Sequence, residues 1–328
     1  MEIICNDYEK VRRNIIDAGK KYLRDNPNIK SLIVGISGGI DSTLVAALAR
    51  EICDETGCHE LIGYSIPIES NEKDEIKRAK LAGKVFCHGF KEIDWIDTCF
   101  HLDFLPNRIL CMQFRTPNYS KGYKKDFKEK VRAGNLKARI RMMFLYDRAY
   151  KHNGLVLSTD NLTEYNLGFW TLHGDVGDFG LIQNLWKTEV YKLADYIAKK
   201  YLDTFNKRES TSWLKYENMF KALENAIKAV PTDGLGITDS DFDQLGVDSY
   251  QKADKILIEY LKSGSDNKKL EKHPVIKRHL RYAFKRNNPY NIPRENILPE
   301  PETIDPSIYN STVLSEDSLL VPRGYKSW

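Results

Sequence analysis

The sequence predicts an α/β protein whose sheet is doubly wound, mostly parallel and flanked by helices. The first observation is the continuous apolar run Ser31–Ile36, which is typical of a strand buried on both faces. The second is the glycine-containing turn Ser37–Ser42 with the helix-like segment Thr43–Ile52 behind it, since strand, turn and helix open a βαβ unit. The third is the continued alternation of strand and helix patterns along the chain, which favours a parallel sheet.

Further elements follow in the same alternation. A second strand is expected at Leu61–Pro67, a charged surface helix at Asn71–Gly83 and another buried strand at Gly154–Ser158. The helix expected at Val131–Tyr150 is amphipathic, and its apolar residues at helical spacing are Leu136, Ile140, Met143 and Phe144. The remaining helices are expected at Lys187–Tyr201, Tyr216–Val230, Tyr250–Leu261 and Pro274–Lys285. The C-terminal part of the domain is therefore predicted to be helical.

The domain is expected to run from residue 1 to residue 287, followed by an extended C-terminal tail at residues 288–328. Pro289–Trp328 holds six of the 12 prolines and has no helical periodicity. The chain length of 328 residues is ample to bury one large core.

The composition is that of a soluble globular protein, with 41% hydrophobic and 29% charged residues. No apolar run approaches the roughly 18–20 residues of a membrane helix. Nor does the N-terminus resemble a secretory signal, so a cytoplasmic protein with no membrane contact is expected. None of the 6 cysteines forms a Cys-x-x-Cys pair, which favours reduced thiols over a zinc site.

The net charge of +4 is too small to imply a nucleic acid partner by itself. Its distribution is uneven, because nine basic residues face two acidic ones between Lys121 and Arg141. This stretch can be a solvated helix face or a surface that meets the phosphates of a nucleotide. The sequence leaves both readings open.

The turn after the first strand has the residues that a phosphate site needs. A helix N-terminus offers unpaired amides and partial positive charge. Gly38 and Gly39 let the backbone approach a pyrophosphate, and Ser37 and Ser42 can donate hydroxyl hydrogen bonds. Asp41 can hold a Mg²⁺ ion that bridges phosphate oxygens. The turn has no lysine and is too short for a P-loop.

The whole string from Gly35 to Ser42 resembles the pyrophosphate loop of the ATP pyrophosphatase superfamily, whose fold is adenine nucleotide alpha hydrolase-like. Members of that superfamily cleave ATP to AMP and pyrophosphate. Further segments, in order along the chain, resemble the ammonia-dependent NAD synthetase family. These segments are Gly134–Met142, Thr159–Glu164, Gly168–Thr171, Gly174–Asp175, Leu185–Tyr191, Pro231–Leu235, Asp243–Gly246 and Lys285–Arg286.

This resemblance implies a role for each matched position. The ATP phosphates would be bound by Gly35, Ile36, Ser37, Gly38, Gly39, Ile40, Asp41 and Ser42. Further contacts to ATP would come from Thr159, Lys187 and Thr232. Asp41 and Lys187 would act in catalysis, and Mg²⁺ would be ligated by Asp41 and Glu164. The dinucleotide substrate would be contacted by Arg139, Asp178 and Lys285.

Elementary chemistry supports part of this assignment. Lys187 begins a helix, where a lysine is unfavourable against the helix dipole, so a negative group is expected nearby. Glu164 follows the strand end at Thr159 closely enough for a short loop or helical turn to bring its carboxylate towards Asp41. Simpler roles remain open: a salt bridge for Glu164, a solvated basic face for Arg139 and a plain turn for Thr232.

The implied activity is a ligase that adenylates the nicotinate carboxylate of deamido-NAD with ATP and then amidates it with ammonia. A homodimer is also implied. Two positions depart from the family pattern, because Leu172 stands where a lysine is frequent and Phe284 where a histidine is usual. These departures leave a mononucleotide acid open as the substrate. Two further alternatives are a tRNA-modifying ATP pyrophosphatase, favoured only by the basic stretch Lys121–Arg141, and a nucleotide-binding protein that keeps the fold without catalysis.

Overall fold

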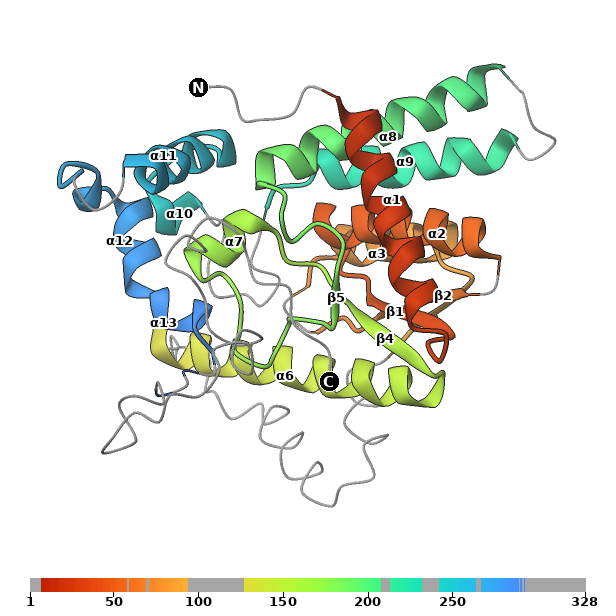
Figure 1. The fold of residues 1–328 in the computed structure, drawn as a ribbon, viewed down its shortest axis with the longest axis horizontal. Coiled ribbons are helices and arrows are strands. Elements are labelled where there is room, and N and C mark those ends of the chain that lie inside the picture. Colours follow the sequence, from red (N-terminus) through yellow and green to blue (C-terminus); the bar gives the residue numbers. More distant parts are fainter. Residues whose placement is uncertain are drawn as a thin grey trace, which may run out of the picture.

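The computed structural model describes residues 7–57, 59–68, 71–93, 127–207, 213–231, 242–263 and 267–288, together with 290 and 292. Five strands form one parallel sheet in the order β3-β2-β1-β4-β5 (Figure 1). The strands are β1 (Ser31–Gly35), β2 (Glu60–Ser65), β3 (Gly89–Glu92), β4 (Gly154–Ser158) and β5 (Phe179–Gly180). The expected α/β class and the parallel sheet are confirmed.

Helices connect and cover the strands. In the first half of the chain they are α1 (Tyr8–Asp25), α2 (Ile40–Thr56), α3 (Lys73–Phe86), α6 (Phe127–Lys151) and α7 (Leu162–Leu167). In the second half they are α8 (Lys187–Lys207), α9 (Trp213–Lys228), α10 (Phe242–Leu245), α11 (Tyr250–Ser263), α12 (Pro274–Arg281) and α13 (Ala283–Arg286). A short 3₁₀ turn, η2 (Leu270–Lys272), precedes α12.

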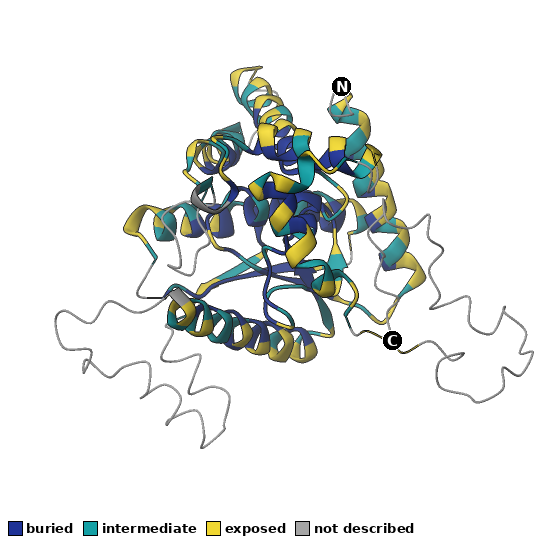
Figure 2. Cartoon of the chain, turned by 90° about the vertical axis from the view of Figure 1, so that its left-hand side faces the viewer, coloured by how far each residue is buried: buried dark blue, intermediate teal, exposed yellow. Residues whose placement is uncertain are grey.

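The two faces of the sheet bury two separate apolar clusters. Leu32 and Val34 of β1 point into a cluster with α1, α2, α3, α8 and α9. Ile33, between them in sequence, points to the opposite face, where it packs with Phe144 and Leu145 of α6. Figures 1 and 2 show α6 below the sheet and the larger helical layer above it. Helices on both faces make the sheet doubly wound, as the buried strand pattern predicts.

A third apolar cluster lies beside the sheet. It is built from α7, α10, α11 and α12 around fully buried Leu167, Leu257 and Ile276. Figure 1 shows these helices at the left, past the ends of the strands. The predicted helical C-terminal part is therefore present, and it forms one wall of the site described below.

Several elements were not expected from the sequence, among them the short helix α10 and the turn η2. β3 and β5 span only 4 and 2 residues and carry no long apolar run. The N-terminal helix α1 is amphipathic and buries Ile16 and Leu23 against α2 and α8. The segment expected as Pro274–Lys285 is divided into α12 and α13 at Tyr282.

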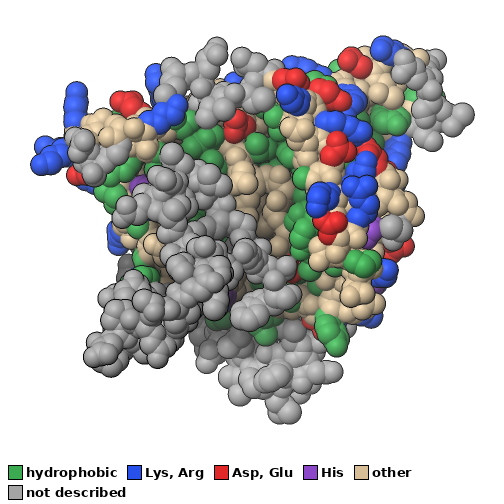
Figure 3. All heavy atoms as spheres, in the orientation of Figure 1, with side chains coloured by type: hydrophobic (Ala, Val, Ile, Leu, Met, Phe, Trp, Pro, Cys, Tyr) green, Lys and Arg blue, Asp and Glu red, His purple; other side chains and the backbone are tan. Residues whose placement is uncertain are grey.

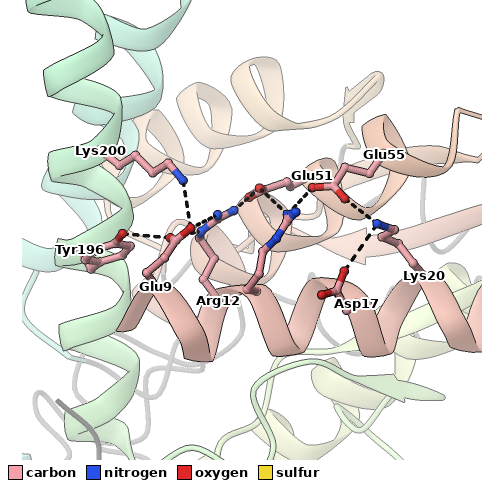
Figure 4. A network of polar contacts seen from close by, with 9 residues as sticks. Glu9, Arg12, Asp17, Lys20, Glu51, Glu55, Tyr196 and Lys200 are labelled. Carbon is pink, nitrogen blue, oxygen red and sulfur yellow. Dashed lines mark hydrogen bonds and ion pairs between the residues drawn. The ribbon is translucent and has the colours of Figure 1, made fainter. Parts of the chain in front are cut away.

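An ion network joins α1 to the larger helical layer (Figure 4). Buried Arg12 donates to Glu9 at 2.8 and 2.7 Å and to Glu51 of α2. Glu9 also accepts a hydrogen bond from Tyr196 of α8 at 2.9 Å. Hydrogen bonding from Arg12 holds the pKa of Glu9 down at about 2. Arg12 and Glu9 of α1 together therefore connect α1 to α2 and α8.

None of the helices among the described ranges is long and apolar enough to cross a bilayer. The predicted tail at residues 288–328 lies almost wholly outside the described residues, so the domain boundary at residue 287 stays a prediction.

Candidate active site

The glycine turn lies at the carboxyl end of β1, where the strand order reverses. β1 pairs with β2 on one side and with β4 on the other, so the chain passes from one half of the sheet to the other beside it. Ligands of open α/β sheets bind at such a switch point, outside the carboxyl ends of the strands. The sheet topology therefore places Ser37–Ser42 where a nucleotide is expected.

Hydroxyl groups shape this loop from inside. The Ser42 Oγ atom accepts a hydrogen bond from the Ser37 amide at 3.2 Å and lies 3.0 Å from the Ser37 Oγ atom. The Ser37 Oγ atom in turn accepts a bond from the Gly39 amide at 3.2 Å. Gly39 is the N-cap of α2 and provides no side-chain cap. The first-turn amides of α2 are thus left to an anion.

Gly38 is required by its conformation and by its neighbour. Its φ angle is +86°, and an added Cβ atom would lie 2.4 Å from the carbonyl oxygen of Glu75 in α3. The Arg78 Nε atom donates a hydrogen bond to the Gly38 carbonyl at 3.2 Å, which holds the loop from the α3 side. The loop can therefore approach α3 closely only with glycine here.

Three charged side chains from three helices meet at the loop. Asp41 is in the first turn of α2, Glu164 is in α7 and Lys187 begins α8. The Lys187 Nζ atom donates to an Oδ atom of Asp41 and, at 2.9 Å, to an Oε atom of Glu164. The Lys187 side chain is 5% exposed, and the two carboxylates are 18% exposed each. The negative group expected beside Lys187 is therefore present twice.

Asn161 joins the same group and positions it. It caps α7 in a reciprocal capping box, accepting from the Glu164 amide at 3.1 Å while its own amide donates to the Glu164 side chain. The Asn161 Nδ2 atom also donates to Asp41 at 2.9 Å. The short helix after β4 thus brings the Glu164 carboxylate to Asp41, as the spacing from Thr159 suggests.

One ammonium does not fully stabilise the two carboxylates of this group as anions. Burial raises the pKa of Glu164, and the Lys187 charge opposes that rise only in part because Asp41 faces the same ammonium. Burial lowers the pKa of Lys187, but Asp41 and Glu164 outweigh it and raise that pKa well above its ordinary value. With its pKa raised to about 8, Glu164 is largely protonated at neutral pH, and a further cation beside it would favour its carboxylate form.

These donors fit Mg²⁺. The ion prefers carboxylate oxygen, and it commonly takes one or two carboxylates from the protein and the rest from phosphates and water. Asp41 and Glu164 supply such a pair beside the anion-binding loop. No group of three or more His, Cys, Asp or Glu side chains suited to a metal occurs among the described residues. An ion held here would therefore share its coordination with a phosphate ligand.

A cavity of about 650 Å³ extends from the loop to the C-terminal helices. Its loop end is lined by Ser37, Asp41, Glu164 and Lys187, and Thr159 lies in its wall. Its far end is lined by Arg139, Trp170, Thr171, Asp175, Tyr282 and Lys285. This volume is in the usual range for small-molecule sites. An elongated ligand can therefore reach both the loop and the far end.

Cationic groups at the far end are held by backbone carbonyls. The Lys285 Nζ atom donates to the carbonyls of Gly168, at 2.8 Å, and Trp170, and burial lowers its pKa to about 8. The Arg139 Nε atom donates to the carbonyl of Leu172 at 3.2 Å. Leu172 therefore contributes its backbone to the site.

Two acids at the centre of the cavity were given no role in the sequence analysis. The Asp175 carboxylate accepts from the Thr171 amide at 2.8 and 3.1 Å, and burial raises its pKa to about 7. The Asp160 carboxylate accepts from the Ser158 hydroxyl at 3.2 Å, and burial together with Asp175 raises its pKa well above its ordinary value. The signal for Asp160 in the sequence was its position, two residues after the end of the buried strand β4.

Asp178 lies elsewhere. Its carboxylate accepts from the Tyr146 hydroxyl of α6 at 2.7 Å and from the Val156 amide at 3.1 Å. It is exposed and does not line the cavity. The structure therefore groups Arg139 and Lys285 but not Asp178. Thr232, the last ATP contact predicted, is outside the described residues.

The sheet is parallel, and an uncapped helix begins at its switch point. Two acids and a lysine lie beside that helix start. These features together define a nucleotide-binding α/β protein. The chain belongs to the NAD synthase family, whose model matches residues 11–289. That range includes every described site residue named above.

Individual relatives agree with this assignment. The NH(3)-dependent NAD(+) synthetase of Thermoplasma acidophilum is 28% identical over 279 residues, which are 84% of this chain and 96% of the relative. The synthetase of the same name from Mycoplasmopsis pulmonis is 31% identical over 258 residues, which are 77% of this chain and 81% of the relative.

Solved structures share the fold. An NMN synthetase from Francisella tularensis has a TM-score of 0.63 at 22% identity and covers 88% of this chain and 100% of its own. An NH3-dependent NAD synthetase from Campylobacter jejuni has a TM-score of 0.57 at 23% identity, with the same coverage. At this identity the likeness concerns the fold alone.

Proposed function

We propose that this chain is an ATP-dependent ligase that converts deamido-NAD and ammonia to NAD, with AMP and pyrophosphate as the other products. The proposal depends on one observation. Asp41, Glu164 and Lys187 lie together at the end of the cavity that the Ser37–Ser42 loop forms. Membership of the NAD synthase family supports the same reaction.

In the first step a carboxylate oxygen of the substrate attacks the α-phosphorus of ATP, and the bond to the β-phosphate oxygen breaks. Pyrophosphate leaves with the bonding electron pair towards the first-turn amides of α2. Those amides and the Lys187 ammonium stabilise the charge on the leaving group. Holding both reactants in one cavity can lower the barrier by roughly 7–11 kcal/mol.

In the second step ammonia attacks the carbonyl carbon of the acyl adenylate, and AMP leaves. Adenylation is needed because a free carboxylate does not react with an amine. Arg139 and Lys285 at the far end of the cavity would hold the rest of the substrate. Their cationic groups suit the phosphates of a dinucleotide.

We propose that Asp41 and Glu164 hold Mg²⁺ when ATP is bound. The ion would neutralise charge on the phosphates. Lys187, which is shared by both carboxylates in this structure, would then be released in part towards the phosphate oxygens.

We also propose a homodimer formed through the outer face of α6. That face exposes Met143, Tyr146 and Tyr150, which are 53%, 40% and 90% exposed and follow one another at helical spacing. Asp178 is bonded to Tyr146 on the same side, so its carboxylate would lie near the partner subunit. We further propose that the protein acts in the cytoplasm, which supplies ATP and keeps thiols such as buried Cys53 and Cys87 reduced.

A tRNA-modifying activity is not favoured. Family membership points to another substrate, and Figure 3 shows basic and acidic side chains interspersed over the face that carries α1. Nucleic acid binding usually requires a patch of one sign.

The test is incubation of the full chain with ATP, Mg²⁺ and ammonium, in parallel with deamido-NAD, nicotinate mononucleotide or tRNA. AMP and amide are quantified, and Asp41→Asn serves as the site control. Equal amounts of AMP and NAD with deamido-NAD, and loss of both in the variant, are expected. Faster turnover of the mononucleotide, AMP only with tRNA, or no AMP with any acceptor would each overturn the proposal.

A further inference from the structure

Asp254 is a buried carboxylate next to the site that the reaction above does not use. It lies in α11, is 0% exposed and does not line the cavity. Burial of a carboxylate is costly unless hydrogen bonds replace its hydration. An apolar side chain would fill the same space at lower cost if packing were the only requirement.

Three donors compensate Asp254, and all of them belong to the starts of α7 and α8. The Thr163 hydroxyl donates to one carboxylate oxygen at 2.5 Å. The Thr188 hydroxyl and the Thr188 amide donate to the other, at 2.6 and 2.9 Å. Thr163 directly precedes Glu164, and Thr188 directly follows Lys187.

The Thr163 hydroxyl also connects the two helices to each other. While it donates to Asp254, it accepts a hydrogen bond from the Lys187 amide at 2.8 Å. The first two amides of α8 are thus capped by side chains of α7 and α11, and not by the residue directly before the helix. This contrasts with α2, whose N-cap has no side-chain bond.

The capping arrangement holds Lys187 in an unfavourable place. A cation at a helix N-terminus opposes the helix dipole, and a carboxylate at the same end offsets that field. Tyr250, one turn before Asp254 in α11, places its ring 5.3 Å from the Lys187 Nζ atom. α11 therefore contacts the Lys187 ammonium through the Tyr250 ring, and through Asp254 it binds Thr188, the residue that follows Lys187.

We propose that Asp254 is a positioning residue that sets Lys187 and Glu164 against Asp41 through the Thr163 and Thr188 hydroxyls. The expected loss of activity rests on the proposed function. The expected change in the position of Lys187 does not. It also makes the C-terminal helical layer part of the catalytic arrangement, because α11 is the only element that bonds both threonines among the described residues.

The kinetic test compares Asp254→Asn with Asp248→Asn in the full chain. Asparagine keeps the shape of Asp254 but points an NH₂ group at the threonine donors. Asp248 is the control, because it is 69% exposed and its only ion pair among the described residues is with Lys252. Per mole of folded protein, we expect kcat to fall at least tenfold in Asp254→Asn with KM for ATP changed less than threefold. Asp248→Asn should match the wild type.

The structural test does not depend on turnover. In protein labelled with ¹⁵N at the lysine ζ position, a buried and ion-paired ammonium gives an NMR signal protected from exchange with water, assigned by Lys187→Arg. We expect this signal in the wild type and in Asp248→Asn, and its loss or shift in Asp254→Asn. If the wild type turns over no acid, the proposed function fails while this signal still decides the role of Asp254.

Thr188→Val provides a second variant should Asp254→Asn not fold. It keeps the carboxylate, its Thr163 donor and the Thr188 amide donor, and removes one hydroxyl. We expect kcat to fall at least threefold and the Lys187 signal to shift. The proposal is overturned if folded Asp254→Asn has the wild-type kcat and an unchanged Lys187 signal. If Asp254→Asn does not fold, the same result in Thr188→Val overturns it.

Discussion

At the scale of single residues, the site depends on one ammonium shared by two carboxylates. Asp41, Glu164 and Lys187 come from three helices, and each is buried enough for the Coulomb attraction to be strong. The same burial makes each of them costly to leave without its partner. Function and stability therefore both respond to a change at Lys187.

Lys187→Met should be severe in both respects. It removes the cation that stabilises pyrophosphate, so kcat should fall about 10²-fold or more, as for loss of one donor from an oxyanion site. It also removes the ion-pair partner of two part-buried carboxylates, which should cost roughly 3–5 kcal/mol of unfolding free energy. Steady-state kinetics and urea denaturation measure the two effects. Lys199→Met in the same helix, where the lysine is 69% exposed, should leave both unchanged.

His279 should make the fold sensitive to mild acid. Burial, with the nearby Arg286 charge, lowers the pKa of His279 from 6.5 to about 4. Between these two values the imidazole is protonated in the unfolded chain and neutral in the folded chain. Its stability contribution is present above pH 6.5 and is lost as pH falls, by about 3 kcal/mol at pH 4. Asp175, whose pKa is raised to about 7, acts in the opposite direction over this range.

The measurement is therefore a difference. The unfolding free energy of the wild type minus that of His279→Gln should decrease by about 3 kcal/mol between pH 7 and pH 4. A difference that does not depend on pH would contradict a neutral buried imidazole.

At the scale of elements, helix starts organise the molecule. α2 begins uncapped and faces the cavity, α7 begins with a capping box, and α8 begins under Thr163 and Asp254. Side chains bind the Glu164 amide of α7 and the Lys187 and Thr188 amides of α8, so of these three helix starts the uncapped one of α2 is suited to phosphate.

Arg12→Met should loosen α1 without touching the reaction. Arg12 is 4% exposed, but its partners Glu9 and Glu51 are 45% and 28% exposed and are partly screened by water. The expected loss is about 1–2 kcal/mol, or roughly 2–6 °C in Tm. Differential scanning calorimetry checks it. Arg13→Met, at a position 41% exposed, is the matched control and should change Tm by less than about 1 °C.

Sequence patterns predicted those elements whose own residues carry the signal. β1 and β4 are continuous apolar runs and were placed to within one residue. α6 and α8 were found by their helical periodicity, but α6 begins four residues earlier and α8 ends six residues later than expected. β5 has only 2 residues and exists because β4 is beside it. This strand is defined by its pairing with β4 in the folded protein, and the local sequence does not predict it.

The same distinction holds in the site. Asp41, Glu164 and Lys187 stand at strand ends or helix starts, where position alone suggests chemistry. Asp254 stands in the middle of an amphipathic helix and meets Thr163 across 91 residues of sequence. Nothing local distinguishes it from a solvent-facing acid, and only the fold brings it to the site.

At the scale of the whole molecule, the cavity joins two parts of the chain. The loop end is built on the sheet and the far end on the C-terminal helices, with α7 between them. The exposed apolar face of α6 lies on the far side of the sheet from the larger helical layer (Figure 2).

Tyr150→Lys should weaken the proposed dimer, because it puts a charge at the most exposed residue of that apolar face. Sedimentation velocity should show the wild type as a dimer and the variant shifted to monomer at micromolar concentration. Leu214→Lys in α9, where the leucine is 56% exposed, is the control and should sediment as the wild type. A monomeric wild type would contradict the assignment of this face.

The central claim is that the substrate carboxylate is adenylated in the cavity at the Ser37–Ser42 loop. The most direct measurement uses deamido-NAD with ¹⁸O in both carboxylate oxygens, ATP, Mg²⁺ and ammonium, with ³¹P NMR of the products. Attack on the α-phosphorus predicts that each AMP molecule carries one ¹⁸O atom on its phosphate and that pyrophosphate carries none. AMP without ¹⁸O, or label in inorganic phosphate beside ADP, would contradict it.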